Sequence, residues 1–201
     1  MASVKQATIF YFTGTGNSGK VAEWISQVAD ELGIPVQNIH IGEINRREFL
    51  KTNPPSISSP GHNYLFISPT HGFNYAPVMM HFIMRFPKGQ NKVALINTRA
   101  GMRIGKFVTP GLSGIALLFS ALILKIKGFS IQALFPVDLP SNWISIHPAI
   151  RRKGLEIIHA KNKQRVQKFA HRFFSGERVL RGLRDLIQDI IISPIAILYY
   201  F

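Results

Sequence analysis

Short apolar runs alternate with stretches of helical periodicity along most of this chain of 201 residues. Each run is rich in β-branched and aromatic residues and has the length of a strand, and apolar residues at helical spacing follow it. This alternation predicts an α/β fold, a doubly wound five-stranded parallel sheet with helices on both faces. The expected strands are Ala7–Phe12, Pro35–Ile41, Tyr64–Ser68, Lys92–Asn97 and Ser130–Val137.

Helices are expected in most of the segments that connect these strands. They cover about Gly19–Leu32, Pro77–Phe86, Leu112–Lys127 and Ala149–Ser175. Residues 44–61 contain three prolines and are expected to form a loop, with a short helix at its start. Phe107–Leu124 carries no charge, but its apolar part is shorter than the roughly 20 residues of a membrane span. We therefore expect a helix buried against the sheet there.

The absence of cysteine excludes several classes of site. The chain cannot form disulfides, thiolate metal sites, a cysteine nucleophile or a cysteine-ligated iron–sulfur cluster. The histidines show no spacing typical of metal ligands, so we expect no metal. No signal-peptide pattern is visible at the first residues, and the cytoplasm is the expected location.

The chain is strongly basic, with 24 Lys and Arg residues against 10 Asp and Glu residues and a formal net charge of +14. Eleven of the 24 basic residues lie between Arg151 and Arg184. Such an excess favours an anionic partner. Because no recognised nucleic-acid-binding motif accompanies it, we expect no nucleic-acid partner and interpret the basic residues as mainly a solvated helix face.

The loop after the first expected strand has the composition of an anion site. Its residues are Thr13, Gly14, Thr15, Gly16, Asn17 and Ser18. Glycines let successive N–H groups turn inward, hydroxyls and the amide can donate hydrogen bonds, and the following helix adds its positive dipole end. A tight strand-to-helix turn without a ligand is the alternative. The Walker A spacing is missing, and the acidic residue of a dinucleotide fingerprint is absent unless Glu43 replaces it.

Ile9–Ser18 (IFYFTGTGNS) resembles the FMN phosphate loop of flavodoxins. More narrowly, it resembles the flavodoxin domain of bacterial proteins that join a flavodoxin to a ferredoxin. The similarity continues at Ser68–Phe73, Asn97–Gly101 and Phe135–Trp143, and covers about residues 7–175. It implies a flavodoxin-like fold and an FMN cofactor. Those relatives carry a ferredoxin module that is absent here, so the chain either uses a separate electron donor or is a fragment of a longer protein.

The resemblance also implies two loops around the flavin ring. The residues expected there are Pro69, Thr70, His71, Gly72 and Phe73 in one loop and Thr98, Arg99, Ala100 and Gly101 in the other. Phe73 and Tyr75 are candidates for stacking on the ring, with a place in the core as the alternative. Arg99 is expected to offset the negative charge of reduced flavin. His71 is weighed as a proton donor against an ordinary loop residue, and no catalytic residue is assigned.

The last part of the chain differs in character from the rest. We expect a flavodoxin-like domain over residues 1–176 and a basic and apolar helical tail over residues 177–201. An amphipathic helix with basic and apolar faces suits a peripheral membrane contact. It equally suits packing on another domain or on a second copy of the chain.

The sequence therefore predicts an FMN-binding, flavodoxin-like electron-transfer protein. Its expected partner is a redox protein, either a reductase or a protein of the ferredoxin type. One alternative is an FMN-dependent oxidoreductase that acts on a small substrate such as a quinone or porphyrinogen. Another is a non-redox nucleotide-binding module. Whether the protein is an enzyme or a carrier stays open at this point.

Overall fold

The computed structural model describes residues 4–52, 61–104, 107–140, 152–185, 187–191 and 194–195. Its strands are β1 (Gln6–Tyr11), β2 (Val36–His40), β3 (His62–His71), β4 (Asn74–Tyr75), β5 (Lys92–Ile104), β6 (Phe107–Thr109), β7 (Ser130–Pro140) and β8 (Val179–Leu180). Its helices are α1 (Asn17–Glu31), α2 (Arg46–Thr52), α3 (Pro77–Arg85), α4 (Ala116–Ile126) and α5 (Arg152–Phe174), with a 3₁₀ helix η1 (Arg181–Asp185).

The main sheet has the order β2-β1-β3-β5-β7-β8, and all of these neighbours are parallel. From β1 the chain first steps outward to β2 and later crosses to β3 on the other side of β1. This reversal of direction is the feature that defines a doubly wound sheet. All five expected strands lie in the sheet, so the predicted fold class is confirmed; β8 adds a sixth strand at the edge.

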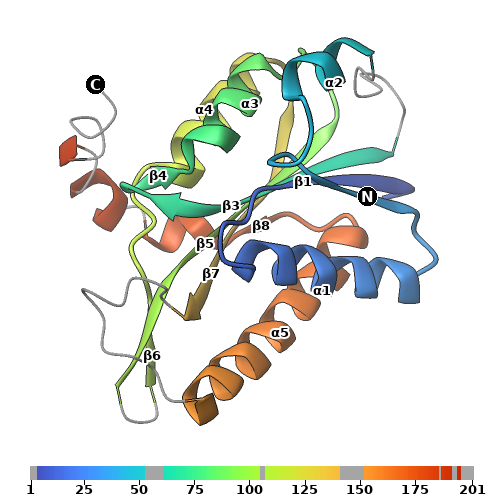
Figure 1. Cartoon of the computed structure of the whole chain (residues 1–201). Coiled ribbons are helices and arrows are strands. Elements are labelled where there is room, and N and C mark those ends of the chain that lie inside the picture. The colour runs from blue at the N-terminus through green and yellow to red at the C-terminus, as the bar shows by residue number, and fades with distance from the viewer. Residues whose placement is uncertain are drawn as a thin grey trace.

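Helices cover both faces of the sheet, as Figure 1 shows. Helices α1 and α5 pack on one face, where the ring of Phe135 in β7 stacks on that of Phe169 in α5 with centroids 4.3 Å apart. Helices α3 and α4 pack on the other face, where Phe10 in β1 meets Phe82 in α3 at 5.0 Å. Two apolar cores therefore hold the sheet in place from opposite sides.

Helix α4 begins later than the sequence predicts, at Ala116 rather than Leu112. Gly114, just before it, has φ +56°, and its chain passes so close to Phe73 that an added Cβ would clash with the Phe73 carbonyl oxygen. Helix α4 packs on the sheet through buried Leu117 and Leu124, as expected, but Ile126 on its outer side is 74% exposed. Among the described residues, no helix combines the length and apolar character needed to cross a membrane.

The predicted loop after Asn97 is wrong, because strand β5 continues without interruption to Ile104. Strand β7 is also longer than expected, and the two strands pair as far as Gly101 opposite Pro140. Strand β6 then folds back on the end of β5 as an antiparallel partner. The backbone hydrogen bonds offered by these neighbours outweigh the local tendency of a glycine-containing segment to leave a strand.

The helical period predicted after Gly176 is wrong at Val179 and Leu180, which form β8. These residues pair with Ala133 and Leu134 of β7, and Val179 is buried in the core beneath α1 and α5. The free edge of β7 supplies backbone partners that an isolated helix would not use. Residues 187–191 are helical again, while residues 196–201 of the expected tail lie outside the described ranges.

Candidate functional site

The carboxyl ends of β1, β3 and β5 meet at one edge of the sheet, at the left of Figure 1. Strand β2 lies on one side of β1 and strand β3 on the other, so the loops that follow β1 and β3 lead away from each other at this edge. In doubly wound sheets, ligands bind in the crevice that such a divergence leaves. The loops predicted to bind the cofactor all start here.

The β1–α1 loop forms an open cradle at the start of α1. Gly16 caps the helix with φ +90°, a left-handed conformation that favours glycine, and its N–H donates to the Thr13 hydroxyl at 2.9 Å. A Cβ built on Gly14 or Gly16 would meet no atom within 4 Å, so the space in front of both residues is open. The first-turn amides of a helix have no partner within it, and here they lie directly behind this space.

The next two residues tie the cradle to the sheet. The Asn17 side chain donates to the carbonyl oxygen of Pro140 at the end of β7, at 3.0 Å. The Ser18 hydroxyl is buried and forms a 2.8 Å hydrogen bond with the Thr98 hydroxyl on β5. Both side chains were predicted as direct anion ligands. In the structure they fix the loop to β7 and β5, and their backbone amides stay at the helix start.

His40, at the end of β2, is a neighbour of the cradle that the sequence analysis did not identify. Its ring stacks on Tyr11 with centroids 4.9 Å apart, and its Nδ1 lies 2.8 Å from a carboxylate oxygen of Glu43. The Thr13 N–H points toward its Nε2 at a long 3.4 Å. Glu43, considered above as a replacement for the acidic residue of a dinucleotide fingerprint, is therefore paired with His40. The only signal in the sequence is that His40 ends the strand beside β1.

The second predicted loop is a tight turn between β3 and β4. Pro69, Thr70 and His71 belong to β3 and lead into it. Gly72 and Phe73 both have positive φ, 51° and 63°, which is the pattern of a type I′ hairpin turn. Such a φ is costly for an aromatic residue and persists only where the surroundings impose it.

The surroundings of the Phe73 turn are visible in the segment before α4. The Ile115 N–H donates to the Phe73 carbonyl oxygen at 2.8 Å, and Gly114 packs directly against the same peptide. The segment before α4 therefore holds a partly exposed aromatic ring at the edge of the site. Tyr75, the other stacking candidate, is wrong for that role because it is fully buried and its hydroxyl donates to the carbonyl oxygen of Phe66 at 3.4 Å.

A buried hydrogen-bond acceptor without a partner lies between β3 and β5. The Asn97 side chain is fully buried and its Nδ2 donates to the Thr70 hydroxyl at 3.0 Å. Its Oδ1 has no hydrogen-bond partner among the described residues. Buried polar atoms are nearly always paired, so an unpaired acceptor at this edge fits a ligand that brings a donor.

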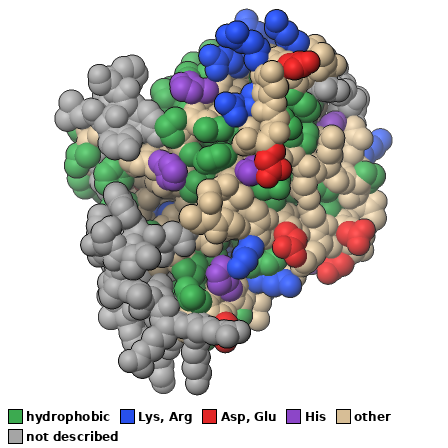
Figure 2. Space-filling view, in the orientation of Figure 1, with side chains coloured by type: hydrophobic (Ala, Val, Ile, Leu, Met, Phe, Trp, Pro, Cys, Tyr) green, Lys and Arg blue, Asp and Glu red, His purple; other side chains and the backbone are tan. Residues whose placement is uncertain are grey.

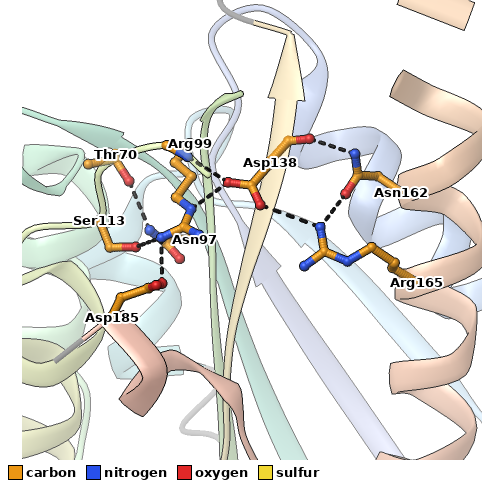
Figure 3. A network of polar contacts seen from close by, with 9 residues as sticks. Thr70, Asn97, Arg99, Ser113, Asp138, Asn162, Arg165 and Asp185 are labelled. Atoms are coloured by element: carbon orange, nitrogen blue, oxygen red, sulfur yellow. Dashed lines mark hydrogen bonds and ion pairs between the residues drawn. The ribbon is translucent and has the colours of Figure 1, made fainter. Parts of the chain in front are cut away.

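Arg99 lies at the centre of a buried network, drawn in Figure 3. Its Nε donates to Asp138 at 2.6 Å, and its Nη1 donates to Asp185 at 2.6 Å and to the Ser113 hydroxyl at 2.8 Å. Burial alone would lower the pKa of Arg99, but the charges and hydrogen bonds of Asp138 and Asp185 outweigh this effect and raise it. Arg99 therefore does not offer an unpaired positive charge to a reduced flavin, contrary to the sequence-based expectation.

Asp138 of β7 connects both faces of the sheet. Besides Arg99, it accepts from the Gly111 N–H at 2.8 Å and from Arg165 of α5 at 3.4 Å. Its carbonyl oxygen accepts from the Asn162 side chain at 2.6 Å. The sequence analysis missed these partners, although a single carboxylate inside the apolar run of β7 indicates a paired charge.

Comparisons with known proteins give the fold a name. No protein-family model and no curated protein sequence matches the chain. Among solved structures, the Streptococcus pneumonia TIGR4 flavodoxin matches with a TM-score of 0.53 and 15% identity, over 83% of this chain and 95% of that one. A short-chain flavodoxin associated with a PDU bacterial microcompartment matches with a TM-score of 0.51 and 16% identity, over 83% and 94%. The chain has a flavodoxin-like fold.

A third match is to a longer protein. Rubredoxin:oxygen oxidoreductase from Desulfovibrio gigas matches with a TM-score of 0.51 and 16% identity, over 84% of this chain but only 37% of that protein. Our chain thus spans little more than a third of that oxidoreductase. Within the flavodoxin-like sheet, the cradle lies at the switch between β1 and β3, where this fold class binds its ligands.

Three residues of the sequence resemblance cannot be placed at the site. Ser141, Asn142 and Trp143, which contribute to the sequence resemblance, lie outside the described residues. Over the described ranges, no group of three or more His, Asp and Glu side chains is arranged to hold a metal ion. The candidate site is therefore described by the cradle, the β3–β4 turn and the edge of β5.

Proposed function

We propose that this chain binds FMN and acts as an electron carrier in the cytoplasm. The cradle at the start of α1 carries the proposal. Gly16 holds its left-handed cap with open space in front, at the point where β1 and β3 diverge. Helix N-termini at such positions bind phosphate groups. The fold and the TGTGNS sequence of the loop support the same cofactor.

The residues of the cradle fit a phosphate. The amides of Asn17, Ser18 and Gly19 belong to the first turn of α1, where no intrahelical acceptor is available. Thr15 is exposed at the rim of the cradle and carries a hydroxyl group there. The side chains of Asn17 and Ser18 keep the loop in place through Pro140 and Thr98. This arrangement neutralises a phosphate with dipoles and hydrogen bonds rather than with a lysine.

The β3–β4 turn and the end of β5 fit an aromatic ring system with polar edges. The partly exposed Phe73 supplies an apolar surface, and Gly72 supplies a peptide that a ring can approach closely. Asn97 Oδ1 is able to accept a hydrogen bond from a ring N–H. When bound, FMN supplies one- or two-electron transfer. This chain's residues hold it, orient it and exclude water from one side.

A carrier suits the described edge better than an enzyme for a small substrate. An enzyme of that kind needs a positioned proton donor beside the ring. His71 is the titratable side chain of the β3–β4 hairpin, and it is exposed to solvent. The proposed partner is a redox protein, a reductase or a protein of the ferredoxin type. The sequence resemblance to flavodoxin–ferredoxin fusion proteins supports this choice.

The test compares FMN with riboflavin, which lacks the phosphate. We expect FMN to bind at least about 100-fold more tightly, measured by quenching of flavin fluorescence, because the cradle contacts only the phosphate. Gly16→Ala should remove most of this difference, because the alanine disfavours the left-handed cap. Gly33→Ala is the matched control, since Gly33 lies beyond the other end of α1 with φ +65° and equally open surroundings. Equal affinities for both flavins in the wild type would refute the proposal.

A further inference from the structure

Four arginines from α5 and η1 gather at the β8 edge of the sheet. Arg165 and Arg172 project from α5, and Arg181 and Arg184 lie on η1. We call these four residues the arginine cluster. Arg181 is central to it: burial first, and then the positive charges of Arg165, Arg184 and Arg172, lower its pKa. Elements distant in the sequence thus concentrate like charge at one place.

Carboxylates balance only half of this cluster. Arg165 contacts Asp138 at 3.4 Å, and Arg172 contacts Glu177 at 2.6 Å. Arg181 and Arg184 are exposed, and among the described residues neither has a carboxylate partner. The guanidinium carbon of Arg181 lies 6.0 Å from the centroid of the Phe135 ring. Keeping unpaired like charges together costs free energy, so the cluster suits an anionic partner.

Apolar side chains border the same cluster. Arg184 lines a shallow hollow together with Asp185, Ile187, Gln188 and Ile191. The two isoleucines are 76% and 70% exposed, and Leu183 of η1 is 43% exposed. Exposed apolar residues beside arginines are typical of protein interfaces, which have an apolar centre and a polar rim. Arginine is also among the residues enriched where partners bind most strongly.

The cluster is connected to the proposed cofactor site by a continuous network, seen in Figure 3. Arg165 contacts Asp138, Asp138 contacts Arg99, and Arg99 contacts Asp185 at the border of the hollow. Arg99 precedes Ala100 on the strand edge expected to face the flavin. A partner seated on the cluster would therefore contact residues that are one or two ion pairs away from Arg99, a residue of the second expected ring loop.

We propose that the arginine cluster and its isoleucine-lined hollow are the docking surface for an acidic region of a redox partner protein. The inference rests on the proposed function, since it concerns the partner of the same site. Exposed isoleucines bordered by arginines match the apolar centre and polar rim of protein interfaces, so we choose a protein partner, and a lipid surface is an alternative outcome of the test.

The other basic region of the molecule provides a control. In Figure 2, Lys and Arg side chains gather at the top of the molecule, in the region of α2 and the end of α3. Arg47 and Lys51 of α2 are exposed and lie one helical turn apart. Replacing both by glutamine changes the net charge by the same amount as replacing Arg181 and Arg184. The two double variants therefore distinguish an effect of the local surface from an effect of the overall net charge.

The probe is an acidic plant-type [2Fe–2S] ferredoxin, and its binding is measured by interferometry with and without FMN. We expect the wild type to bind it at low ionic strength and about tenfold or more weakly in high salt. Arg181→Gln/Arg184→Gln should weaken binding at low salt about tenfold, whereas Arg47→Gln/Lys51→Gln should change it less than twofold. Arg181→Lys/Arg184→Lys, which keeps the charge, should retain most of the affinity. Thermal unfolding of each variant checks that the fold is intact.

Several results would overturn the docking surface. They are a wild type that does not bind the probe at low salt, equal losses in the two glutamine variants, and no loss in the Arg181 and Arg184 variant. If Arg181→Gln/Arg184→Gln lost binding to phosphatidylserine vesicles and kept its binding to ferredoxin, the cluster would be a membrane contact instead. Because the binding assay does not need the flavin, a failure of FMN to bind would refute the proposed function separately.

Discussion

Two arginines of this chain make ion pairs of the same length in different surroundings. Arg99 and Arg172 each place Nε 2.6 Å from a carboxylate oxygen. The Arg99 side chain is 3% exposed and that of Asp138 is 9% exposed, whereas the side chains of Arg172 and Glu177 are 47% and 48% exposed. Water screens the second pair and not the first, so burial rather than distance decides what each pair contributes.

We predict that Arg99→Ala lowers the free energy of unfolding by about 3–5 kcal/mol, because it leaves Asp138 and Asp185 without their common partner. Arg172→Ala should lower it by less than about 1 kcal/mol. Urea unfolding of both variants beside the wild type measures the difference. Equal losses would mean that Asp138 and Asp185 find solvent or other donors when Arg99 is removed.

Asp189 is a carboxylate that the fold buries. It is 1% exposed, and within the described part of the chain neither of its oxygens has a hydrogen-bond partner. Burial first, and then the nearby charge of Asp185, raise its pKa from 3.8 to about 6, while Arg99 acts in the opposite direction. Because the folded state binds this proton more tightly than the unfolded chain, stability falls as the pH rises from about 3.8 through about 6.

We predict that Asp189→Asn removes this dependence. Near pH 4 the variant and the wild type should be almost equally stable, and at about pH 8 the variant should be more stable by on the order of 2 kcal/mol. Urea unfolding across this pH range gives the comparison. The exposed Asp30→Asn is the control, because it removes a carboxylate of the same type from the surface and should change the free energy of unfolding little. A variant that is less stable than the wild type at about pH 8 would show that the charged form of Asp189 has a partner.

At the residue scale, the sequence predicts which groups form an anion site better than it predicts which side chains contact one another. The glycines and hydroxyls of residues 13–18 indicate an anion cradle because their local conformation is enough to form one. The pairing of Arg99 with Asp185 depends on segments 86 positions apart in the chain, so no local pattern contains it. Phe73 and Tyr75 are two residues apart and chemically alike, and only the hairpin turn decides that the first is partly exposed and the second is buried.

At the element scale, the positions of the five main strands follow from their β-branched and aromatic residues, but their ends do not. Strand β5 extends seven residues beyond Asn97 because β7 and β6 offer backbone partners there. Strand β8 is only two residues long, and the free edge of β7 makes it a strand. Strand ends depend on the neighbour across the sheet, which the local sequence does not contain.

The segment before α4 is a further case in which packing overrides periodicity. Helical spacing extends to Leu112, yet Gly114 and Ile115 are held against the Phe73 peptide and the helix starts afterwards. One contact thus determines both the start of a helix and the position of a turn at the candidate site. This coupling explains why the sequence predicts that both elements exist but does not predict their boundaries.

At the scale of the whole molecule, the contacts of β8 and η1 make residues 177–185 part of the main fold. Val179 lies in the core with α1 and α5, and Asp185 closes the ion network on Arg99. A division after residue 176 would leave the edge of β7 without its neighbour and Arg99 with one carboxylate fewer. Exposed strand edges with apolar side chains favour aggregation.

We therefore predict different outcomes for two truncations. A chain that ends at Gly176 should lose several kcal/mol of unfolding free energy or aggregate, because it loses a strand pairing and a buried ion pair. A chain that ends at Asp185 keeps β8 and the Arg99 contact, and it also lacks the buried charge of Asp189, so it should unfold close to the wild type. Thermal unfolding and size-exclusion chromatography compare the three chains. If both truncated chains were as stable and as monomeric as the wild type, residues 177–185 would be a separable tail, and the chain after α5 would add nothing to the stability of the sheet.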